Sequence, residues 1–457
     1  MKTTPRKPST GTPAAPTAGA RPAPPLWRQL QRVGAMVAGV RSGRSLTALL
    51  DAVEPGLRAG VQALSFAALR QLGRAQALRS VLARRPPPPA ADALLCATLA
   101  LLAEPTPAYT DFTLVDQAVE AAKRDAATRA QAAFINACLR RFLREREALM
   151  QATDADPEAR WNHPRWWIER LAADHPQQAA LILEANQHAA PMTLRVNRRR
   201  AQVGEVLQAL AAQGLAAQPV GEDGVLLGRA VPVDALPGFA EGALSVQDAG
   251  AQRAAPLLLD ALGATASRPR VLDACAAPGG KTAHLLERAD LDLTALDIDP
   301  ARCERIRDNL RRLGLSARVL AADAAQPDTW WDGEPYDGIL LDAPCTASGI
   351  VRRHPDVRWL RRESDVAQLE RVQAQLLDTL WPLLRPGGCL VFCTCSVFRA
   401  EGSDQAQAFL ARHTDARILP APGHLLPTNG ARTSAVPDNA AGDHDGFFYA
   451  AFRKVLG

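Results

Sequence analysis

Residues 272–282, LDACAAPGGKT, form a glycine-containing loop whose residue types are compatible with two kinds of ligand. The loop ends like the phosphate-binding motif G-x-x-x-x-G-K-S/T, but Cys275 stands where that motif has its first glycine. Asp297 ends the next predicted strand, where a carboxylate accepts hydrogen bonds from both hydroxyls of a ribose. The pattern therefore favours a nucleoside cofactor without phosphate, such as S-adenosylmethionine, for which Gly279 and Gly280 allow close approach of the backbone.

A nucleoside-triphosphate hydrolase is the alternative interpretation of this loop. The predicted strand YDGILLDAP ends in Asp342, which could bind the magnesium ion of such an enzyme. A triphosphate hydrolase does not need the carboxylate of Asp297, however, whereas an enzyme that binds a nucleoside cofactor does. We therefore favour the methyl donor.

Further aspartates and cysteines follow the next predicted strands. Asp323 follows ARVLAAD, where it can accept a hydrogen bond from an adenine amino group; Asp342 and Cys345 follow the next strand, and Cys393 and Cys395 lie in the one after it. This combination suits methylation of C5 of a pyrimidine. C5 becomes nucleophilic only after a thiolate adds to C6 while an acid near N3 absorbs the developing charge. The residues alone leave open which thiol attacks.

The remaining cysteines and the lysine of the loop have simpler explanations. Cys389 and Cys393 are expected to be small core residues of an apolar strand. A zinc cluster of Cys345, Cys389, Cys393 and Cys395 would lack the C-x-x-C spacing of structural sites, so we expect no metal. The chain has only five lysines beside 48 arginines, and Lys281 is one of the five. Either a compact ammonium group is needed at this position, or the lysine is there by chance.

Strands and helices alternate from about residue 249 to the end of the chain. This rhythm predicts a Rossmann-like α/β domain over residues 248–457, with a doubly wound, mostly parallel sheet that binds ligands at the carboxyl ends of its strands. The expected strands are RVLDA, LTALDID, ARVLAAD, YDGILLDAP and GGCLVFCTCS, and the expected helices span 300–313, 363–384 and 401–412.

Three segments are expected before this domain. Residues 160–247 combine short strands such as MTLRVN with a helix at 201–214, which indicates a small α+β, RRM-like domain. Residues 28–150 are helical apart from the proline run RRPPPPAAD, which indicates an all-α bundle. Residues 1–27 are rich in Pro and Ala, and we expect them to be disordered.

Basic residues are concentrated in the N-terminal third. Residues 1–150 contain 21 Lys and Arg against 10 Asp and Glu, a net charge of +11, of which the tail contributes only +4. A basic bundle of this kind suggests docking on RNA. Four arginines lie around the polar side of the predicted helix FINACLRRFLRERE: Arg140, Arg141, Arg144 and Arg146. The alternative is a solvated helix face on which Glu145 and Glu147 pair with these arginines.

The sequence also indicates a compartment. It contains no apolar run long enough to span a bilayer, and its N-terminal residues lack the apolar core of a secretory signal. The eight cysteines are scattered without a disulfide framework. We therefore expect a cytoplasmic protein with reduced thiols.

Four segments together resemble the RNA cytosine-C5 methyltransferases of the NOL1/NOP2/Sun class: DACAAPGGKT, DAPCTASG, FCTCSV and DGFFYAAFRK. The segments FTLVDQAVEAAK and FINACLRRFLRE resemble the helical NusB-type RNA-binding domain. The resemblance covers nearly everything after residue 27. It implies a NusB-like bundle, a small α+β domain and a methyltransferase domain, and S-adenosylmethionine-dependent methylation of C5 of a cytosine in 16S ribosomal RNA, at cytosine 967.

The resemblance also implies a role for each site residue. Cys395 of the T-C-S element is the nucleophile that forms a covalent adduct with C6, Cys345 of the P-C element assists product release, and Asp342 contacts N3 and N4 of the cytosine. Thr346 departs slightly from the family, in which serine is commoner. The donor site carries over onto Cys275, Ala276, Ala277, Pro278, Gly279, Gly280, Lys281, Asp297, Asp323 and Asp342.

Two other functions remain as alternatives at this stage. One is C5 methylation of another RNA, such as tRNA, and the other is a non-catalytic RNA-binding assembly factor. Both thiols and all four carboxylates, including Asp273, are present, which argues against a catalytically dead domain. We expect ribosomal RNA as the partner, no membrane association, no metal and a monomeric protein.

Overall fold

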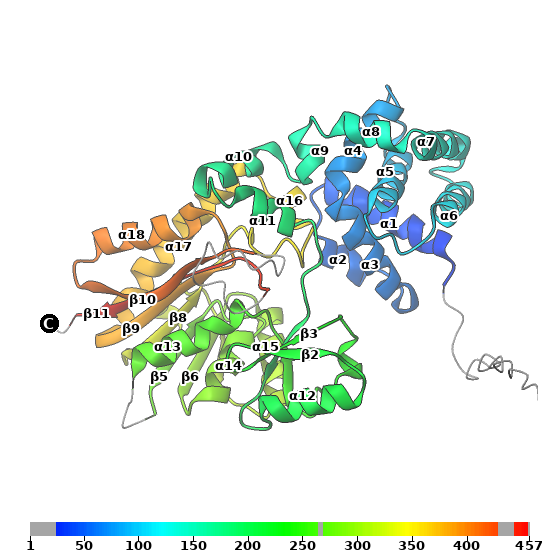
Figure 1. Ribbon diagram of the computed structural model, residues 1–457. Helices are drawn as coiled ribbons and strands as arrows, with labels where there is room; N and C mark the ends of the chain where they lie inside the picture. Colours follow the sequence, from blue (N-terminus) through cyan, green and yellow to red (C-terminus); the bar gives the residue numbers. More distant parts are fainter. Residues whose placement is uncertain (1–23, 264–267, 428–442, 456–457) are drawn as a thin grey trace, which may run out of the picture.

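The computed structural model describes residues 24–263, 268–427 and 443–455. In these residues the chain forms a helical bundle, a small four-stranded sheet and a seven-stranded sheet with helices on both faces (Figure 1). These parts match the expected architecture. The expected disorder of residues 1–27 falls mostly outside the described residues, but helix α1 begins at Leu26, so the last two residues of that segment are helical.

Helix α5 (Pro89–Ala103) forms the centre of the bundle. It is apolar on all sides after Asp92, begins at the last proline of the proline run, and packs against α1, α3, α4, α6 and α7. Helix α7 buries Ile135, Cys138, Leu139 and Phe142 in the core of the bundle. The other helices are α1 (Leu26–Arg41), α2 (Leu46–Asp51), α3 (Pro55–Arg70), α4 (Leu72–Leu82), α6 (Asp111–Arg124), α7 (Ala132–Arg144) and α8 (Arg146–Thr153).

Three helices connect the bundle to the small sheet: α9 (Pro157–Trp161), α10 (Arg165–Asp174) and α11 (Ala179–Ala185). Helices α10 and α11 lie within the segment predicted as the small α+β domain, residues 160–247. They pack on the large domain, where the Trp167 ring meets the Phe398 ring edge-on at 5.1 Å between ring centroids. Their apolar side chains share a core with Val351 and Val397, which flank the two cysteine-containing loops.

The small sheet is entirely antiparallel, with strand order β2-β3-β1-β4. Its strands are β1 (Thr193–Val196), β2 (Ala217–Val220), β3 (Gly224–Leu227) and β4 (Leu244–Val246), and helix α12 (Val203–Ala212) contributes Val206 and Leu210 to its core. Strand β2 is not among the strands that the sequence predicted. Its four residues, AQPV, include a proline and bury only Val220, so no apolar alternation marks it.

The large sheet has the order β10-β11-β9-β8-β5-β6-β7 and is parallel except at β11, which runs antiparallel to both of its neighbours. Its strands are β5 (Arg270–Ala274), β6 (Asp292–Asp297), β7 (Arg318–Ala321), β8 (Tyr336–Asp342), β9 (Leu384–Thr394), β10 (Ala416–Leu425) and β11 (Phe447–Lys454). The five parallel strands from β5 to β9 are those the sequence predicted. Strands β10 and β11 were not predicted.

Helices cover both faces of this sheet. One core lies beneath α13 (Ala254–Leu262), α14 (Gly280–Arg288) and α15 (Pro300–Leu313), and the other beneath α17 (Glu363–Leu380) and α18 (Ser403–Arg412) (Figure 1). The parallel register places Ala274 of β5 opposite Leu296 of β6 and Leu341 of β8. The carboxyl ends of these strands therefore meet at one edge of the sheet, as the doubly wound fold requires.

The bundle contacts the large domain through the segment that follows the P-C element. In this segment, which contains helix α16 (Val357–Leu360), Asp356 accepts a hydrogen bond from the Leu46 amide at 2.9 Å, and the Trp359 indole donates to the Leu69 carbonyl at 2.8 Å. The bundle is therefore bonded to a segment that continues directly from one of the cysteine loops. None of the helices in the described part of the chain is long and apolar enough to cross a membrane.

Candidate active site

The glycine loop joins β5 to α14, and its backbone conformation explains one of its glycines. Gly279 has φ +92° at the N-terminal end of α14, in the left-handed region that favours glycine. A Cβ atom there would lie only 3.1 Å from Ile306 Cγ2 and 3.2 Å from Ile306 Cα of α15. Gly279 is therefore required for the turn and for the packing of α15. Cys275 also has positive φ, at +61°.

Two of the predicted donor-site aspartates bind the backbone of this edge. Asp297 ends β6 and accepts hydrogen bonds from the amides of Ala277, at 3.1 Å, and Asp299, at 3.2 Å. Its carboxylate also lies 3.3 Å from the Arg302 guanidinium. Asp323, after β7, accepts a hydrogen bond from the Ala325 amide at 2.9 Å. Both carboxylates are thus held in place by backbone donors.

A cavity of about 660 Å³ lies at the carboxyl ends of the strands. The predicted residues that line it are Cys275, Ala277, Pro278, Asp297, Asp323, Asp342, Cys345 and Cys395. Ala276, Gly279, Gly280 and Lys281 are not among the residues that line it. The structure therefore brings together the strand-end acids and both candidate thiols, while four residues of the predicted donor site do not line the cavity.

Sequence reasoning missed several apolar residues of the cavity. Ile298 follows Asp297 directly, lines the cavity and is 65% exposed, and Leu376 and Val372 of α17 line another side. An exposed isoleucine directly after a strand-end acid was a readable signal. The α17 residues had no such signal, because helical spacing predicts an apolar face but not the strand ends that it will meet.

Lys281 and Asp342 form an ion pair beside the cavity. Lys281 Nζ donates to Asp342 Oδ2 at 2.6 Å, and the Cys393 thiol donates to Asp342 Oδ1 at 3.4 Å. Burial alone would lower the pKa of Lys281, but the nearby Asp342 carboxylate raises it well above its usual value. Lys281 therefore stays charged, which gives the compact ammonium group a structural role. Cys389 and Cys393 are buried, as expected of core residues.

The two candidate thiols face each other. Cys345 Sγ and Cys395 Sγ are 3.3 Å apart, and both residues line the cavity. The pKa of Cys345 is raised well above its usual value, first by its hydrogen bond with Cys395 and then by burial. Cys345 is therefore a neutral thiol at physiological pH. In the described part of the chain, no group of three or more His, Cys, Asp or Glu residues is arranged to hold a metal ion.

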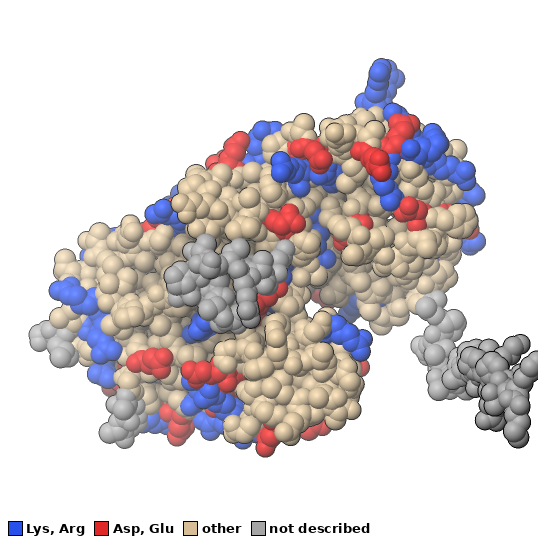
Figure 2. Space-filling model, in the orientation of Figure 1, with Lys and Arg blue, Asp and Glu red and all other residues tan. Residues whose placement is uncertain are grey.

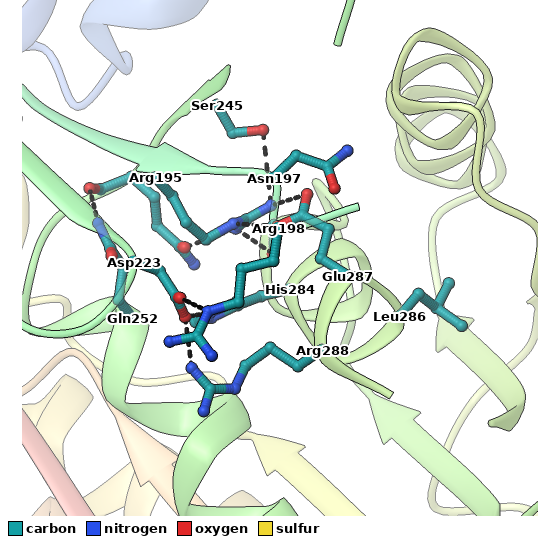
Figure 3. A network of polar contacts seen from close by, with 12 residues as sticks. Arg195, Asn197, Arg198, Asp223, Ser245, Gln252, His284, Leu286, Glu287 and Arg288 are labelled. Carbon is teal, nitrogen blue, oxygen red and sulfur yellow. Dashed lines mark hydrogen bonds and ion pairs between the residues drawn. The ribbon is translucent and has the colours of Figure 1, made fainter. Parts of the chain in front are cut away.

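A buried ionic network connects the small sheet to the glycine loop (Figure 3). Arg195 of β1 binds both carboxylate oxygens of Glu287 at 2.8 Å and donates to the Gly280 carbonyl at 2.7 Å. Beside it, Asp223 accepts hydrogen bonds from His284, at 2.8 Å, and Arg288, at 2.5 Å. Arg195 was not predicted, although an arginine inside the apolar strand MTLRVN was a visible anomaly.

Comparison with known proteins gives extensive matches. Residues 262–453 match the family described as 16S rRNA methyltransferase RsmB/F, and residues 163–234 match the ferredoxin-like domain of the RsmF/B-like methyltransferases. The chain is 42% identical over 436 residues to ribosomal RNA small subunit methyltransferase B of Pseudomonas syringae pv. tomato, covering 92% of this chain and 95% of that protein. It is 44% identical over 427 residues to the protein of the same name from Xanthomonas campestris pv. campestris, covering 90% and 94%.

Solved structures agree with the architecture. The crystal structure of PH0851 matches with a TM-score of 0.70 at 24% identity, covering 93% of this chain and 99% of that chain. A methyltransferase homologue from Pyrococcus horikoshii matches with a TM-score of 0.54 at 28% identity, covering 66% and 98%. The identity and coverage of these matches, together with the strand-end cavity and its two thiols, show that the chain belongs to the RsmB/F family of S-adenosylmethionine-dependent 16S rRNA methyltransferases.

Proposed function

We propose that the protein methylates C5 of a cytosine in 16S ribosomal RNA, at cytosine 967 by family resemblance, through a covalent bond between Cys395 and C6. The observation that carries this proposal is the pair of thiols 3.3 Å apart in the strand-end cavity. Acyl-transfer or phosphoryl-transfer chemistry does not need two thiols at one site. A C5 methyltransferase uses one thiol to attack C6 and a second group to complete removal of the C5 proton.

The cavity fits S-adenosylmethionine in size and charge. Its volume lies within the range of roughly 300–1,000 Å³ that is usual for small-molecule sites. The carboxylates of Asp297, Asp323 and Asp342 line it and outnumber the guanidinium of Arg302, so it favours a cationic ligand. Asp297 would hold the ribose hydroxyls and Asp323 the adenine amino group, while the 275–278 backbone would contact the rest of the cofactor. When bound, the cofactor supplies the methyl group.

The protein residues divide the remaining chemistry among themselves. Cys395, as a thiolate, forms a bond from Sγ to C6, and the electron pair of the C5–C6 double bond becomes available at C5. Asp342, which lines the cavity, would accept hydrogen bonds from the N4 amino group and from a protonated N3, whose proton offsets the negative charge that develops there. After C5 is methylated, loss of the C5 proton allows the Sγ–C6 bond to break. Cys345, whose Sγ lies 3.3 Å from that of Cys395, is the group that we assign to assist this release.

The basic end of the bundle is the proposed RNA-docking surface. Lys and Arg side chains gather around α6 and α7 in Figure 2. The exposed ones are Lys123, Arg124, Arg129, Arg140 and Arg144. Arg141 pairs with Glu145 at 3.0 Å, as the solvated-face alternative predicted. In the part of the chain that the structure describes, however, Lys123, Arg129, Arg140 and Arg144 form no ion pair, so their charge is available to phosphates.

Mapping of 5-methylcytosine tests this proposal. RNA from cells that lack the protein should lose one 5-methylcytosine in 16S ribosomal RNA, which the wild-type protein restores and the Cys395→Ala variant does not. Loss of a tRNA methylcytosine instead would identify another RNA as the substrate. Unchanged methylation of all RNA would favour the non-catalytic assembly factor and contradict the proposal.

A further inference from the structure

Glu401 is a buried carboxylate that connects the two cysteine loops. It ends a short 3-10 turn (Arg399–Glu401) after β9 and is fully buried. Its Oε1 accepts hydrogen bonds from the Thr346 amide at 2.8 Å and from Gln373 Nε2 at 3.3 Å. Its Oε2 accepts hydrogen bonds from the hydroxyls of Ser396, at 2.7 Å, and Thr346. Four donors therefore converge on one side chain.

The partners of Glu401 occupy particular positions in the sequence. Thr346 directly follows Cys345, and Ser396 directly follows Cys395. The same carboxylate thus holds the residue after each thiol. Gln373 extends the connection, because its amide also donates to the Pro344 carbonyl, directly before Cys345, at 2.9 Å.

Further bonds join the two loops beyond the carboxylate. The Gly349 amide donates to the Cys395 carbonyl at 2.9 Å, and the hydroxyls of Ser348 and Ser396 are 2.8 Å apart. Among the described residues, Glu401 is the side chain whose carboxylate hydrogen-bonds to both Thr346 and Ser396.

We propose that Glu401 is a positioning residue that fixes the distance between the Cys345 and Cys395 thiols. The proposal rests on the proposed function in so far as that distance matters for catalysis, but the positioning itself is independent of the reaction. A carboxylate suits the task because it only accepts hydrogen bonds, and each of its oxygens can accept from two donors. Burial raises the pKa of Glu401, while hydrogen bonds from Thr346 and Ser396 oppose that shift.

This arrangement predicts different results for two substitutions. Glu401→Gln keeps one side-chain oxygen, which can still accept hydrogen bonds from the Thr346 and Gln373 N–H groups. Its amide nitrogen would face the hydroxyls of Thr346 and Ser396, which can rotate to accept. It should therefore preserve the loops. Glu401→Met fills similar space but accepts no hydrogen bond, so it should release them.

Binding of phenylarsine oxide measures the thiol distance without any methylation. The reagent condenses with two neighbouring thiols to form two As–S bonds and releases one water. We expect wild-type protein to bind tightly and Cys395→Ala weakly. Glu401→Met should lose about tenfold or more in affinity, while Glu401→Gln should stay within about threefold. Ser396→Ala, which leaves Glu401 three donors, should show an intermediate loss and serves as the second variant if Glu401→Met fails to fold.

Steady-state kinetics give the second readout. In Glu401→Met, kcat should fall while the KM for RNA and the affinity for S-adenosylmethionine stay unchanged, and Glu401→Gln should restore kcat. Unchanged arsenical binding in both Glu401→Met and Ser396→Ala would overturn the positioning role, whatever the reaction is. A different result would contradict the proposed function alone: Glu401→Met loses arsenical binding as expected, but the wild-type protein has no methyltransferase activity. The positioning role would then stand.

Discussion

The acids and thiols of the strand-end cavity are fixed by bonds to the backbone and to neighbouring side chains. Asp297 accepts two amide hydrogen bonds, Lys281 is paired with Asp342, and the two thiols are in mutual contact. Such preorganisation means that little reorganisation is needed when charge develops in the reaction. It also means that substitutions at these residues have structural as well as catalytic effects, which the experiments must separate.

Asp297→Ala should weaken S-adenosylmethionine binding by about 2–4 kcal/mol, because two hydrogen bonds from ribose to a buried charged acceptor would be lost. Isothermal titration calorimetry measures this loss. Asp308→Ala, which removes an exposed carboxylate paired with Arg311, is the matched control and should bind normally. Unchanged affinity in Asp297→Ala would exclude Asp297 from the donor site.

Asp273 should make stability depend on pH. Burial raises its pKa to about 7, although the Thr282 hydroxyl opposes the shift. Between about pH 4 and 7 the Asp273 carboxyl is therefore protonated in the folded protein but ionised in the unfolded chain. This protonation stabilises the folded state at low pH, and the stabilisation is lost as the pH rises toward about 7. The free energy of unfolding, measured by urea denaturation, should decline from about pH 5 to 8 in the wild-type protein. This decline should be smaller in Asp273→Asn by roughly 2–4 kcal/mol. Parallel curves would show that Asp273 is ionised in the folded protein.

The sequence predicted which acids and thiols line the cavity better than it predicted the residues that hold them. Asp297, Asp323, Asp342, Cys345 and Cys395 end or follow parallel strands, and parallel register alone brings such positions to one edge. Arg195 lies 92 residues from Glu287, and Glu401 lies 55 residues from Thr346, although it is close in sequence to Ser396. Their roles depend on how separate elements pack, which no local pattern encodes.

At the scale of elements, β1 of the small sheet is joined to α14 of the large domain through Arg195 and Glu287. Both side chains are almost completely buried, at 0% and 1% exposed. Removing one partner of such a pair leaves an uncompensated charge, whereas replacing both is much less costly. The network therefore fixes the small domain against the helix that begins at the glycine loop.

Arg195→Met should destabilise the protein by about 3–5 kcal/mol, because it leaves Glu287 buried without its partner. The double variant Arg195→Met/Glu287→Met should recover much of this loss, as measured by thermal and urea unfolding. Arg311→Met, which breaks an exposed pair with Asp308, is the control and should change stability little. If the loss of unfolding free energy in the double variant equals the sum of the losses in Arg195→Met and Glu287→Met, the two residues act independently.

The prediction of elements succeeded where a strand or helix has a strong period. Strands β5 to β9 and helices α15, α17 and α18 lie where apolar runs and helical spacing placed them. Strand β10 was missed, since its sequence ARILPAPGHL contains two prolines and buries few residues. The apolar faces of helices α10 and α11 pack beside the cysteine loops, a contact that helical spacing alone does not predict.

At the scale of the whole molecule, the bundle is attached to the segment after the P-C element rather than tethered by a free linker. Asp356 and Trp359 bond to the bundle, and the Arg70 guanidinium donates to the Arg352 carbonyl at 3.1 Å. RNA held by the bundle would therefore lie at a set position relative to the cavity. Removal of residues 1–150 would expose this contact surface, so point substitutions are the better test of RNA docking.

Replacing Lys123, Arg129, Arg140 and Arg144 with Gln should weaken RNA binding and reduce its salt dependence. Each lost phosphate contact lowers the slope of log K against log salt by roughly 0.7–0.9. Donor affinity should not change. The matched control replaces Arg307 and Arg311, which are paired with Glu304 and Asp308, and should keep the wild-type slope. If the slopes of log K against log salt are equal for both variants, the basic residues of the bundle contribute only to solubility and do not contact RNA.

The most direct test of the whole account is the covalent complex with RNA, resolved on a denaturing gel. Cys345→Ala should still attack C6 and transfer the methyl group, then stall as a denaturation-resistant complex because removal of the C5 proton is impaired. Cys395→Ala should form no complex and transfer no methyl group, and the buried Cys393→Ala serves as the control that accumulates none. A stable complex with Cys395→Ala but not with Cys345→Ala would reverse the two roles and contradict the proposed mechanism.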